Sequence, residues 1–329
     1  MNLKKKLHDI ELNQELISSH GKLNVEKLKK INYRLRLEWN YYSNKMEGGT
    51  LTLAETRSVM IGNIDVRGKS LKDIIEMDGH DQVVKEILYI GTGDKRVSEK
   101  RIKQIHSAIM FEYVPELKSQ IGKWKTHPNK LINHKQETVF FTLPAEVPDE
   151  MHQLINRTNA ELDKIRDQRK DQLHPLVIAS SFHKDFVSIH PFYDGNGRTA
   201  RILTNLILTS LGYPVIVINE ENKQGYYKHL GDVQSYGGDP DLFYEYMADR
   251  LIETQQLMLQ VLTEDDSDPF SLENLVKEPS VAYNNMKRTR IKELFRLFEK
   301  TITDRQLQFP VSEAQQQGIL DAVMQELES

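Results

Sequence analysis

The sequence predicts a mainly α-helical protein with one short β-hairpin, and two observations support this fold class. Apolar residues recur at spacings of three and four along most of the chain, and this spacing gives a helix one apolar face. Residues that favour strands gather in one short stretch, 122–144. The chain shows no series of alternating strands and helices, so a parallel sheet is not expected. With 329 residues, 39% of them hydrophobic, it can bury a substantial core.

An amphipathic helix is predicted over about 24–47, within an N-terminal region that we assign to residues 1–97. Its apolar positions run from Val25 to Met46 at threes and fours, and two glycines at 48–49 end it. The other helical segments have the same spacing and are interpreted as scaffold. They cover about 3–18, 53–61, 71–89, 98–111, 148–169, 223–234 and 242–262.

The hairpin is predicted within 122–144. Two flanks rich in strand-forming residues, 122–125 and 137–144, bracket a polar stretch from 129 to 136. The second flank contains Thr138, Val139 and Phe140.

Residues 190–201 concentrate groups that hold phosphate. They supply a base, a carboxylate, two glycines and two arginines, in the order H-P-F-Y-D-G-N-G-R-T-A-R. Apolar spacing predicts one helix up to the break at Pro191 and a second helix from Arg198, opened by the glycines. A glycine-rich turn that leads into a helix N-terminus presents unpaired backbone N–H groups and the positive end of the helix dipole to an anion.

The charged side chains of this run have matching chemistry. Arg198 and Arg201 are three residues apart and therefore on one helix face, where both can reach phosphoryl oxygens. Asp194 is a hard oxygen donor, the kind that Mg²⁺ takes when nucleotide phosphates supply its other ligands. The run therefore indicates a site for a metal–nucleotide complex beside His190.

Two other interpretations fit parts of the same run. The glycines and alanine of 195–200 match a dinucleotide fingerprint, with acids at 220–221 near the distance expected of a ribose-binding acid. That interpretation needs a strand running into the first glycine, whereas the preceding residues have helical spacing. A metal pair of His183 and His190 fits two helical turns, but no third ligand is evident and the chain has no cysteine.

The run resembles the signature of the Fic family, His-Pro-Phe-x-Asp/Glu-Gly-Asn-Gly-Arg-x-x-Arg, and matches every fixed position. The resemblance implies a Fic-type helical core with a small β-hairpin, here about 98–262, with helical extensions at both ends. It also implies a nucleotidyltransferase that moves AMP from Mg²⁺-bound ATP to a Ser, Thr or Tyr hydroxyl of a protein. Gly197 favours this reaction over phosphoryl transfer, because relatives that phosphorylate carry lysine at that position.

The resemblance also implies a role for each residue of the run. His190 is the base that deprotonates the hydroxyl, and Asp194 is the Mg²⁺ ligand. The nucleotide-binding residues are Gly195, Asn196 and Gly197 around the α-phosphate, and Arg198 and Arg201 on the β- and γ-phosphates. Tyr226 and Tyr227 resemble the tyrosines that touch the adenine in the family, and an ordinary core role is the alternative for this aromatic pair.

Residues 43–48, S-N-K-M-E-G, match the inhibitory motif Ser/Thr-x-x-x-Glu-Gly/Asn of Fic proteins. The resemblance implies that Glu47 pairs with Arg201 where the γ-phosphate would lie, and that Ser43 positions the helix. An acidic residue near a helix C-terminus faces the negative dipole end, so a specific partner would explain Glu47. The alternative is a solvated charge before a glycine cap. Some relatives use this glutamate with a metal ion to guide the water that removes AMP, and that activity stays open, as does a non-catalytic nucleotide-binding adaptor.

The resemblance makes the hairpin a flap that pairs its backbone, at Thr138, Val139 and Phe140, with an extended segment of the target. The expected partners are ATP and a hydroxyl-bearing protein, which includes the chain itself, and a homodimer stays open. A net charge of −4 gives no general field for nucleic acid or membrane.

The remaining features concern localisation and the C-terminal region. The chain has no cysteine, no signal-peptide pattern and no stretch apolar enough to span a membrane, so we expect a cytoplasmic protein. The composition turns polar after 265–269. We therefore expect a C-terminal helical extension over 263–329, with helices at 291–298 and 318–327.

Overall fold

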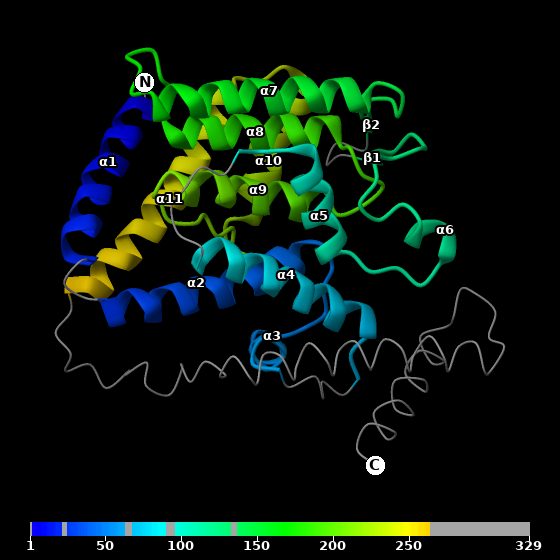
Figure 1. Cartoon of the computed structure of the whole chain (residues 1–329), viewed down its shortest axis with the longest axis horizontal. Coiled ribbons are helices and arrows are strands. Elements are labelled where there is room, and N and C mark those ends of the chain that lie inside the picture. The colour runs from blue at the N-terminus through cyan, green and yellow to red at the C-terminus, as the bar shows by residue number, and fades with distance from the viewer. Residues whose placement is uncertain (1, 22–24, 63–67, 90–95, 133–136, 264–329) are drawn as a thin grey trace.

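The computed structural model describes residues 2–21, 25–62, 68–89, 96–132 and 137–263. Within these ranges the chain forms eleven helices and one two-stranded antiparallel hairpin, which confirms the predicted fold class (Figure 1). The elements are α1 (Asn2–Gly21), α2 (Val25–Met46), α3 (Leu53–Met60), α4 (Leu71–Tyr89), α5 (Glu99–Ile109), α6 (Pro115–Lys118), β1 (Lys130–Ile132), β2 (Thr138–Phe140), α7 (Val147–Arg166), α8 (Pro175–Ile189), α9 (Asn196–Ser210), α10 (Lys223–Tyr236) and α11 (Pro240–Thr263).

The core is built around α8 and α9, the two helices on either side of the turn at 190–195. α8 packs against α7 and α9, and α11 packs along α1, α8 and α10. Phe182, Phe186 and Phe192 are fully buried there. Burial of each such side chain contributes about 1.5–3 kcal/mol, so the ends of α8 and α9 are held firmly where the turn joins them.

Helix α2 lies beneath this core, against α4, α9 and α11 (Figure 1). A buried ion pair joins it to α4, because Arg36 donates to both carboxylate oxygens of Asp81 at 2.7 and 2.8 Å. Asn40 donates to the same carboxylate at 2.6 Å. Breaking a buried pair of this kind typically costs about 3–5 kcal/mol, so these contacts fix the register of α2 on α4. The C-terminal turn of α2 is thereby held beside α9.

Most predicted helices begin and end within a few residues of the observed ones. α4 matches 71–89, and α3 begins at Leu53 because Thr52 and Glu55 form a reciprocal capping box. α9 begins at Asn196 rather than Arg198, so the second glycine of the turn lies inside the first helical turn. α6 was not predicted, because four residues that start at a proline carry no apolar repeat.

The position predicted for the first strand of the hairpin was wrong. β1 lies at Lys130–Ile132, inside the predicted polar stretch, and pairs with β2 so that Leu131 faces Val139. Residues 122–125 turn toward the core instead, where the Trp124 and Phe192 rings lie 5.0 Å apart. Packing against the core therefore competes successfully with strand propensity in that flank.

Residues 215–218 are four consecutive β-branched residues, which favour strands, but they form no strand in the described part of the chain. Val215, Ile216 and Ile218 are buried, but the backbone of this segment is paired by a side chain. Asn205 of α9 donates to the carbonyl of Ile216 at 2.9 Å and accepts from its N–H at 2.8 Å. One amide side chain thus takes the place of a neighbouring strand.

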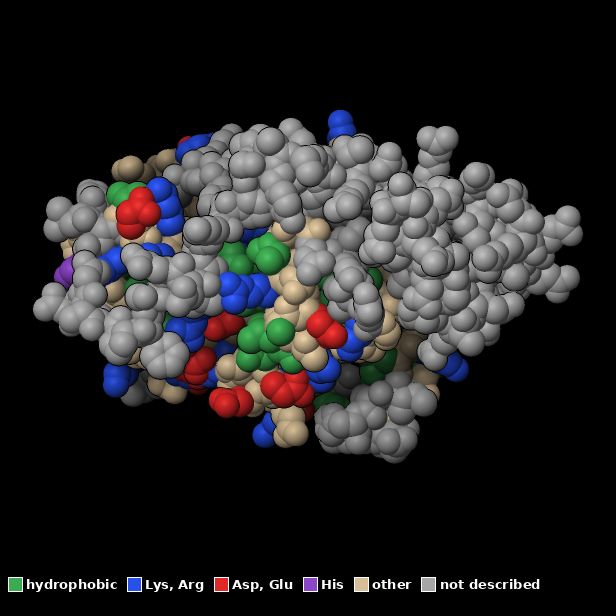
Figure 2. Space-filling view, turned by 90° about the horizontal axis from the view of Figure 1, so that it is seen from below, with side chains coloured by type: hydrophobic (Ala, Val, Ile, Leu, Met, Phe, Trp, Pro, Cys, Tyr) green, Lys and Arg blue, Asp and Glu red, His purple; other side chains and the backbone are tan. Residues whose placement is uncertain are grey.

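On the face seen from below, basic and acidic side chains are interspersed over the described residues (Figure 2). None of the described helices is both long enough and apolar enough to cross a membrane. Residues 264–329 lie outside the described residues, and with them the helices predicted at 291–298 and 318–327.

Candidate active site

The turn between α8 and α9 brings a histidine next to the N-terminus of a helix. His190 follows α8 in the left-handed conformation, with φ 52°, and its N–H donates to the carbonyl of Phe186 at 3.0 Å. Gly195, with φ 72°, immediately precedes α9. A Cβ at this glycine would lie 2.5 Å from the sulfur of Met110, so both backbone conformation and space require glycine there.

The His190 ring lies between the hairpin and this turn. Phe141 stacks on it, with ring centroids 4.0 Å apart and planes 12° from parallel. Burial, together with the nearby Lys125 ammonium, lowers the pKa of His190 to about 4, although two carboxylates act in the opposite direction. The imidazole is therefore unprotonated at neutral pH, which is the state that a general base requires.

A second histidine, His106 of α5, supports the turn from the other side. Its ring stacks on Phe192 with centroids 3.7 Å apart. Its Nδ1 accepts from the N–H of Gly122 at 2.9 Å, so its Nε2 donates to the carbonyl of Asp194 at 3.0 Å. Sequence reasoning missed this residue, although its place on the buried face of α5 with Ile102, Ile105 and Ile109 was a usable signal.

The end of α2 reaches the first turns of α9 through Glu47. Arg201 donates to the Glu47 carboxylate at 2.7 Å, to the hydroxyl of Ser43 at 3.1 Å and to the carbonyl of Ser43 at 2.9 Å. A Cβ at Gly197 would lie 2.5 Å from Oε1 of Glu47. The carboxylate therefore lies directly against the backbone at the start of α9. The Arg201 side chain is 6% exposed and that of Glu47 is 30% exposed.

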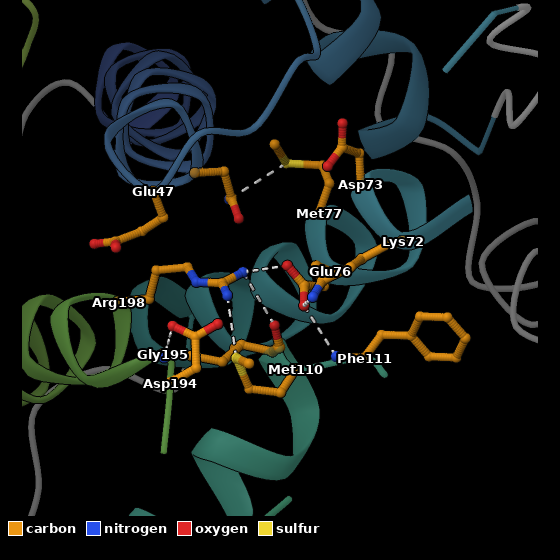
Figure 3. A network of polar contacts seen from close by, with 12 residues as sticks. Glu47, Lys72, Asp73, Glu76, Met77, Met110, Phe111, Asp194, Gly195 and Arg198 are labelled. Atoms are coloured by element: carbon orange, nitrogen blue, oxygen red, sulfur yellow. Dashed lines mark hydrogen bonds and ion pairs between the residues drawn. The ribbon is translucent and has the colours of Figure 1, made fainter. Parts of the chain in front are cut away.

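The other arginine of the run points to a different helix. Arg198 donates to Glu76 of α4 at 2.6 Å, and the same carboxylate accepts from the N–H of Phe111 at 3.0 Å (Figure 3). Both charged side chains are more than nine-tenths buried. Glu76 was not identified from the sequence, because nothing near it in the chain indicates a partner 122 residues away. The two arginines of α9 are thus each paired with a carboxylate from the N-terminal region.

Asp194 lines a cavity together with Glu47, Glu76 and Arg198. One of its carboxylate oxygens accepts from the N–H of Gly195 at 2.7 Å. Among the described residues, no group of three or more His, Asp or Glu side chains is arranged to hold a metal ion. A single carboxylate beside a helix N-terminus would fit an ion that takes its other ligands from a nucleotide and water.

The tyrosines predicted near the adenine have different environments. Tyr226 is 2% exposed and its hydroxyl bonds with Nε2 of His183 at 2.8 Å, whereas Tyr227 is 46% exposed. The other ring nitrogen of His183 bonds with Thr204 at 2.8 Å. Both nitrogens of this buried histidine are occupied, so the alternative of a His183–His190 metal pair is wrong.

The hairpin residues predicted to meet a target lie at the surface. Thr138 and Phe140 are exposed, the latter by 75%, and Val139 is half-buried. Directly after β2, Phe141 packs on His190. The hairpin and the histidine are thus in direct contact. The dinucleotide-fold alternative is wrong, because α8 rather than a strand precedes the glycine turn and the described sheet is antiparallel.

The described helices join a histidine, a carboxylate and a helix N-terminus in one turn, which agrees with the resemblance to the Fic family. Comparisons with known proteins show the family directly. The family model for the Fic/DOC family matches residues 96–208. A crystal structure of a Fic domain-containing signalling protein from Bacteroides thetaiotaomicron is 30% identical, with a TM-score of 0.69. That similarity covers 77% of this chain and 96% of the other. The chain belongs to the Fic/DOC family.

Curated relatives are named for an activity. Protein adenylyltransferase Fic of Nematostella vectensis is 31% identical over 208 residues, which is 63% of this chain and 45% of the relative. The protein of the same name from Drosophila willistoni is 30% identical over 219 residues, which is 67% of this chain and 41% of the relative. The chain therefore spans less than half the length of these two relatives.

Proposed function

We propose that the protein is an autoinhibited adenylyltransferase that moves AMP from Mg²⁺-bound ATP to a hydroxyl side chain of a protein target, with self-modification included. The relatives named protein adenylyltransferase support the class of reaction. The observation that carries the proposal is the placement of His190, with its lowered pKa, beside the N-terminus of α9. A base next to an anion-binding helix end is what transfer from a phosphate to a hydroxyl requires.

In the proposed reaction, the hydroxyl oxygen of the target attacks the α-phosphorus of ATP. The new oxygen–phosphorus bond forms as the bond to pyrophosphate breaks, and the hydroxyl proton passes to His190. Pyrophosphate leaves with the electron pair of the broken bond. The backbone of Gly195, Asn196 and Gly197 at the N-terminus of α9 would hold the α-phosphate oxygens, because the helix dipole and the N–H groups of the first helical turn favour negative charge there. The N–H of Gly195 donates to Asp194 in the described structure, so it would have to exchange that carboxylate for the phosphate.

Asp194 is the residue that would hold Mg²⁺ with the nucleotide. When bound, the ion would neutralise phosphate charge and help pyrophosphate leave. Arg201 would hold the terminal phosphate in the active state. The exposed Tyr227 remains the predicted neighbour of the adenine, whereas the burial of Tyr226 and its bond to His183 favour the core role for that residue. Arg198 would support the β-phosphate while Glu76 fixes its guanidinium from behind.

Autoinhibition is proposed from the contacts of Glu47. Its carboxylate engages Arg201 at 2.7 Å and lies against Gly197, so it competes with phosphate for both the cation and the space. Ser43 holds the same guanidinium through its hydroxyl and its carbonyl. An arginine committed to a carboxylate does not align a nucleotide for in-line attack, so ATP would bind weakly or unproductively.

We also propose that 1–97 acts as a regulatory region and 98–262 as the catalytic core. The regulatory region is closely packed on the core rather than tethered to it, because α1 runs along α11 and α2 contacts α9. Movement of Glu47 would therefore involve a local change at the end of α2 more readily than release of the whole helix.

Removal of AMP from a modified target is a second candidate function. Glu47 and Asp194 line the same cavity, so a carboxylate that orients water would lie near the metal ligand. Under this alternative, Glu47→Gly would abolish activity on a target that already carries AMP. Under the primary proposal, the same change would increase AMP transfer to an unmodified target.

The test is an incubation of the full chain with labelled ATP and a cell lysate, followed by a chase on the labelled proteins. Three forms are compared: the unchanged chain, Glu47→Gly and Glu47→Gly with His190→Ala. We expect weak labelling, strong labelling and none, respectively. Label that stays equal in all three would overturn the proposal. Loss of label in the chase that requires Glu47 would favour the second candidate.

A further inference from the structure

The side chains of Lys125 and Asn129 form a chain of hydrogen bonds that ends at His190. The ammonium of Lys125 donates to Oδ1 of Asn129 at 2.6 Å, and the amide nitrogen of Asn129 lies 2.7 Å from Nδ1 of His190. Lys125 is only 3% exposed. Its backbone N–H donates to the carbonyl of Pro191 at 2.8 Å, and its ammonium lies 3.4 Å from the carbonyl of Ile189. The lysine is thus anchored on both sides of the histidine.

These contacts determine which way the Asn129 amide faces. Its oxygen faces an ammonium, which has donors only, and its nitrogen donates to the carbonyl of Phe192 at 2.9 Å. A flipped amide would place N–H groups against the ammonium and an oxygen against that carbonyl. The amide therefore donates to Nδ1 of His190. A neutral imidazole that accepts at Nδ1 carries its proton on Nε2.

Asn196 also approaches the ring, but from a different direction. Its amide nitrogen lies 3.0 Å from Nδ1 and 3.4 Å from Nε2 of His190. The Nδ1 lone pair lies in the ring plane and points away from Nε2, so an atom on it would be much farther from Nε2 than from Nδ1. The two similar distances therefore place the Asn196 amide nitrogen over the face of the ring. Its oxygen is already occupied by the N–H of Phe192 at 2.9 Å. Asn129 is consequently the amide placed to engage the lone pair.

We propose that Lys125 and Asn129 are positioning residues that keep His190 as the Nε2–H tautomer, with its basic lone pair on Nδ1 covered by the Asn129 amide until a target hydroxyl replaces it. The proposal rests on the role of His190 as the base in the proposed function. In the transfer, the hydroxyl proton goes to Nδ1 while Nε2 keeps its own proton. The oxygen–hydrogen electron pair stays on the attacking oxygen, which bonds to phosphorus.

The location of Asn129 next to β1 links its contact with Nδ1 of His190 to the hairpin. The residue directly precedes β1, and Phe141, which stacks on the same ring, directly follows β2. A target strand that pairs with the hairpin would therefore act on both residues that enclose the base. His190 would be uncovered where a target is present, which limits wasteful attack by water on bound ATP.

Lys125 adds an electrostatic effect. Burial lowers the pKa of Lys125 to about 8, so most of it is charged at pH 7. The charged groups that act on His190 are Lys125, Asp194 and Glu47, and only the lysine favours the unprotonated ring. Loss of Lys125 should therefore raise the pKa of His190 and also free the Asn129 amide to rotate.

The direct test is a ¹⁵N NMR spectrum of the full chain labelled at histidine, without nucleotide, in which the His190 signals are assigned by their loss in His190→Gln. We expect Nδ1 unprotonated and Nε2 protonated at pH 7. Asn129→Asp, which replaces a donor by an acceptor, should move the proton to Nδ1. The opposite tautomer in the unchanged chain, or no change in Asn129→Asp, would overturn the proposal. This readout does not depend on catalysis, so it stands apart from a failure of the proposed function.

A kinetic test uses two lysines of the same loop. In the Glu47→Gly background, Lys125→Met should lower the transfer rate roughly tenfold to a hundredfold, a range typical of a misplaced catalytic group. It should also shift the acid limb of the pH–rate profile to higher pH. Lys125→Arg should keep the limb in place, and Lys123→Met, at an exposed position, should change neither. If Lys125→Met lowers the rate but leaves the acid limb of the pH–rate profile in place, the lysine has only a structural role and its proposed positioning role is refuted.

Discussion

The contact between Glu47 and Arg201 leads to a quantitative prediction for Glu47→Gly. Arg201 donates to the Glu47 carboxylate and to the hydroxyl and carbonyl of Ser43, and this change removes only the carboxylate. Ser43 still holds the guanidinium near its present position. A hydrogen bond between charged partners contributes about 1.5–3 kcal/mol, and Glu47 is partly exposed, which favours the lower part of that range. Release of this contact should therefore raise the transfer rate by a factor near the lower end of roughly tenfold to a hundredfold if the closed state dominates.

The same change should not destabilise the fold strongly. Glu47 follows the last residue of α2, where an acidic side chain faces the negative end of the helix dipole, and it precedes a glycine with φ 90°. Removal of the carboxylate therefore costs little in local structure. This separates the prediction from a general loosening of the protein, which thermal denaturation of both forms would reveal.

The assay measures initial rates of AMP incorporation and ATP affinity by calorimetry. Glu47→Gln keeps the volume over Gly197 but loses the charge, so an intermediate rate is expected from it. Glu26→Gln, which changes an exposed carboxylate on the same helix, serves as the matched control. Glu47→Gly with Arg201→Ala should lose most of the gain. If Glu47→Gly is no faster than the unchanged chain and binds ATP no better, the contact is an ordinary capped helix end and the reasoning fails.

Three further predictions follow from other contacts. Gly197→Ala would place a Cβ 2.5 Å from the Glu47 carboxylate and should therefore weaken the Glu47–Arg201 contact. Protection of the amides at the C-terminus of α2 from hydrogen exchange should then fall, and unchanged protection would contradict the reported packing. Val139→Pro removes a backbone donor from the hairpin, so modification of a protein target should fall more than self-modification, whereas equal loss of both activities would assign the hairpin a different role. Burial lowers the pKa of His183 to about 3 and that of His190 to about 4, so the unfolded chain binds more protons than the folded chain between pH 6.5 and 4. The free energy of unfolding, measured with urea, should therefore fall as the pH is lowered through that window. A constant free energy of unfolding would argue against neutral buried histidines.

The helices were predictable because their signal is local. Apolar spacing repeats within a few residues, and caps such as Thr52 with Glu55 are readable from the sequence. The turn at 190–195 and the start of α9 were predictable for the same reason, since a histidine, a proline and two glycines stand at fixed spacing within one short run. The strand predicted at 122–125 was wrong because Trp124 packs against the core there. Strand propensity describes the local preference of a residue and carries no information about such packing.

The contacts that complete the site were not predictable from spacing. Glu76 meets Arg198 from 122 residues away, and Asn129 meets His190 from 61 residues away. Each is a polar residue whose neighbourhood in the chain resembles an exposed helix face or loop. Their partners become evident only when α4 and the hairpin are folded against α9. The Glu47 contact was foreseen only through the family motif, since the helix dipole by itself indicates a partner without identifying one.

The central claim is that the turn between α8 and α9 transfers AMP, with His190 as the base. Its most direct test uses Glu47→Gly protein and ATP that carries the isotope on either the α- or the γ-phosphate, with and without His190→Ala. We expect protein to be labelled from the α-phosphate alone, with one pyrophosphate released per label, and His190→Ala to abolish labelling while ATP still binds. Label from the γ-phosphate, or α-label that survives His190→Ala, would contradict it.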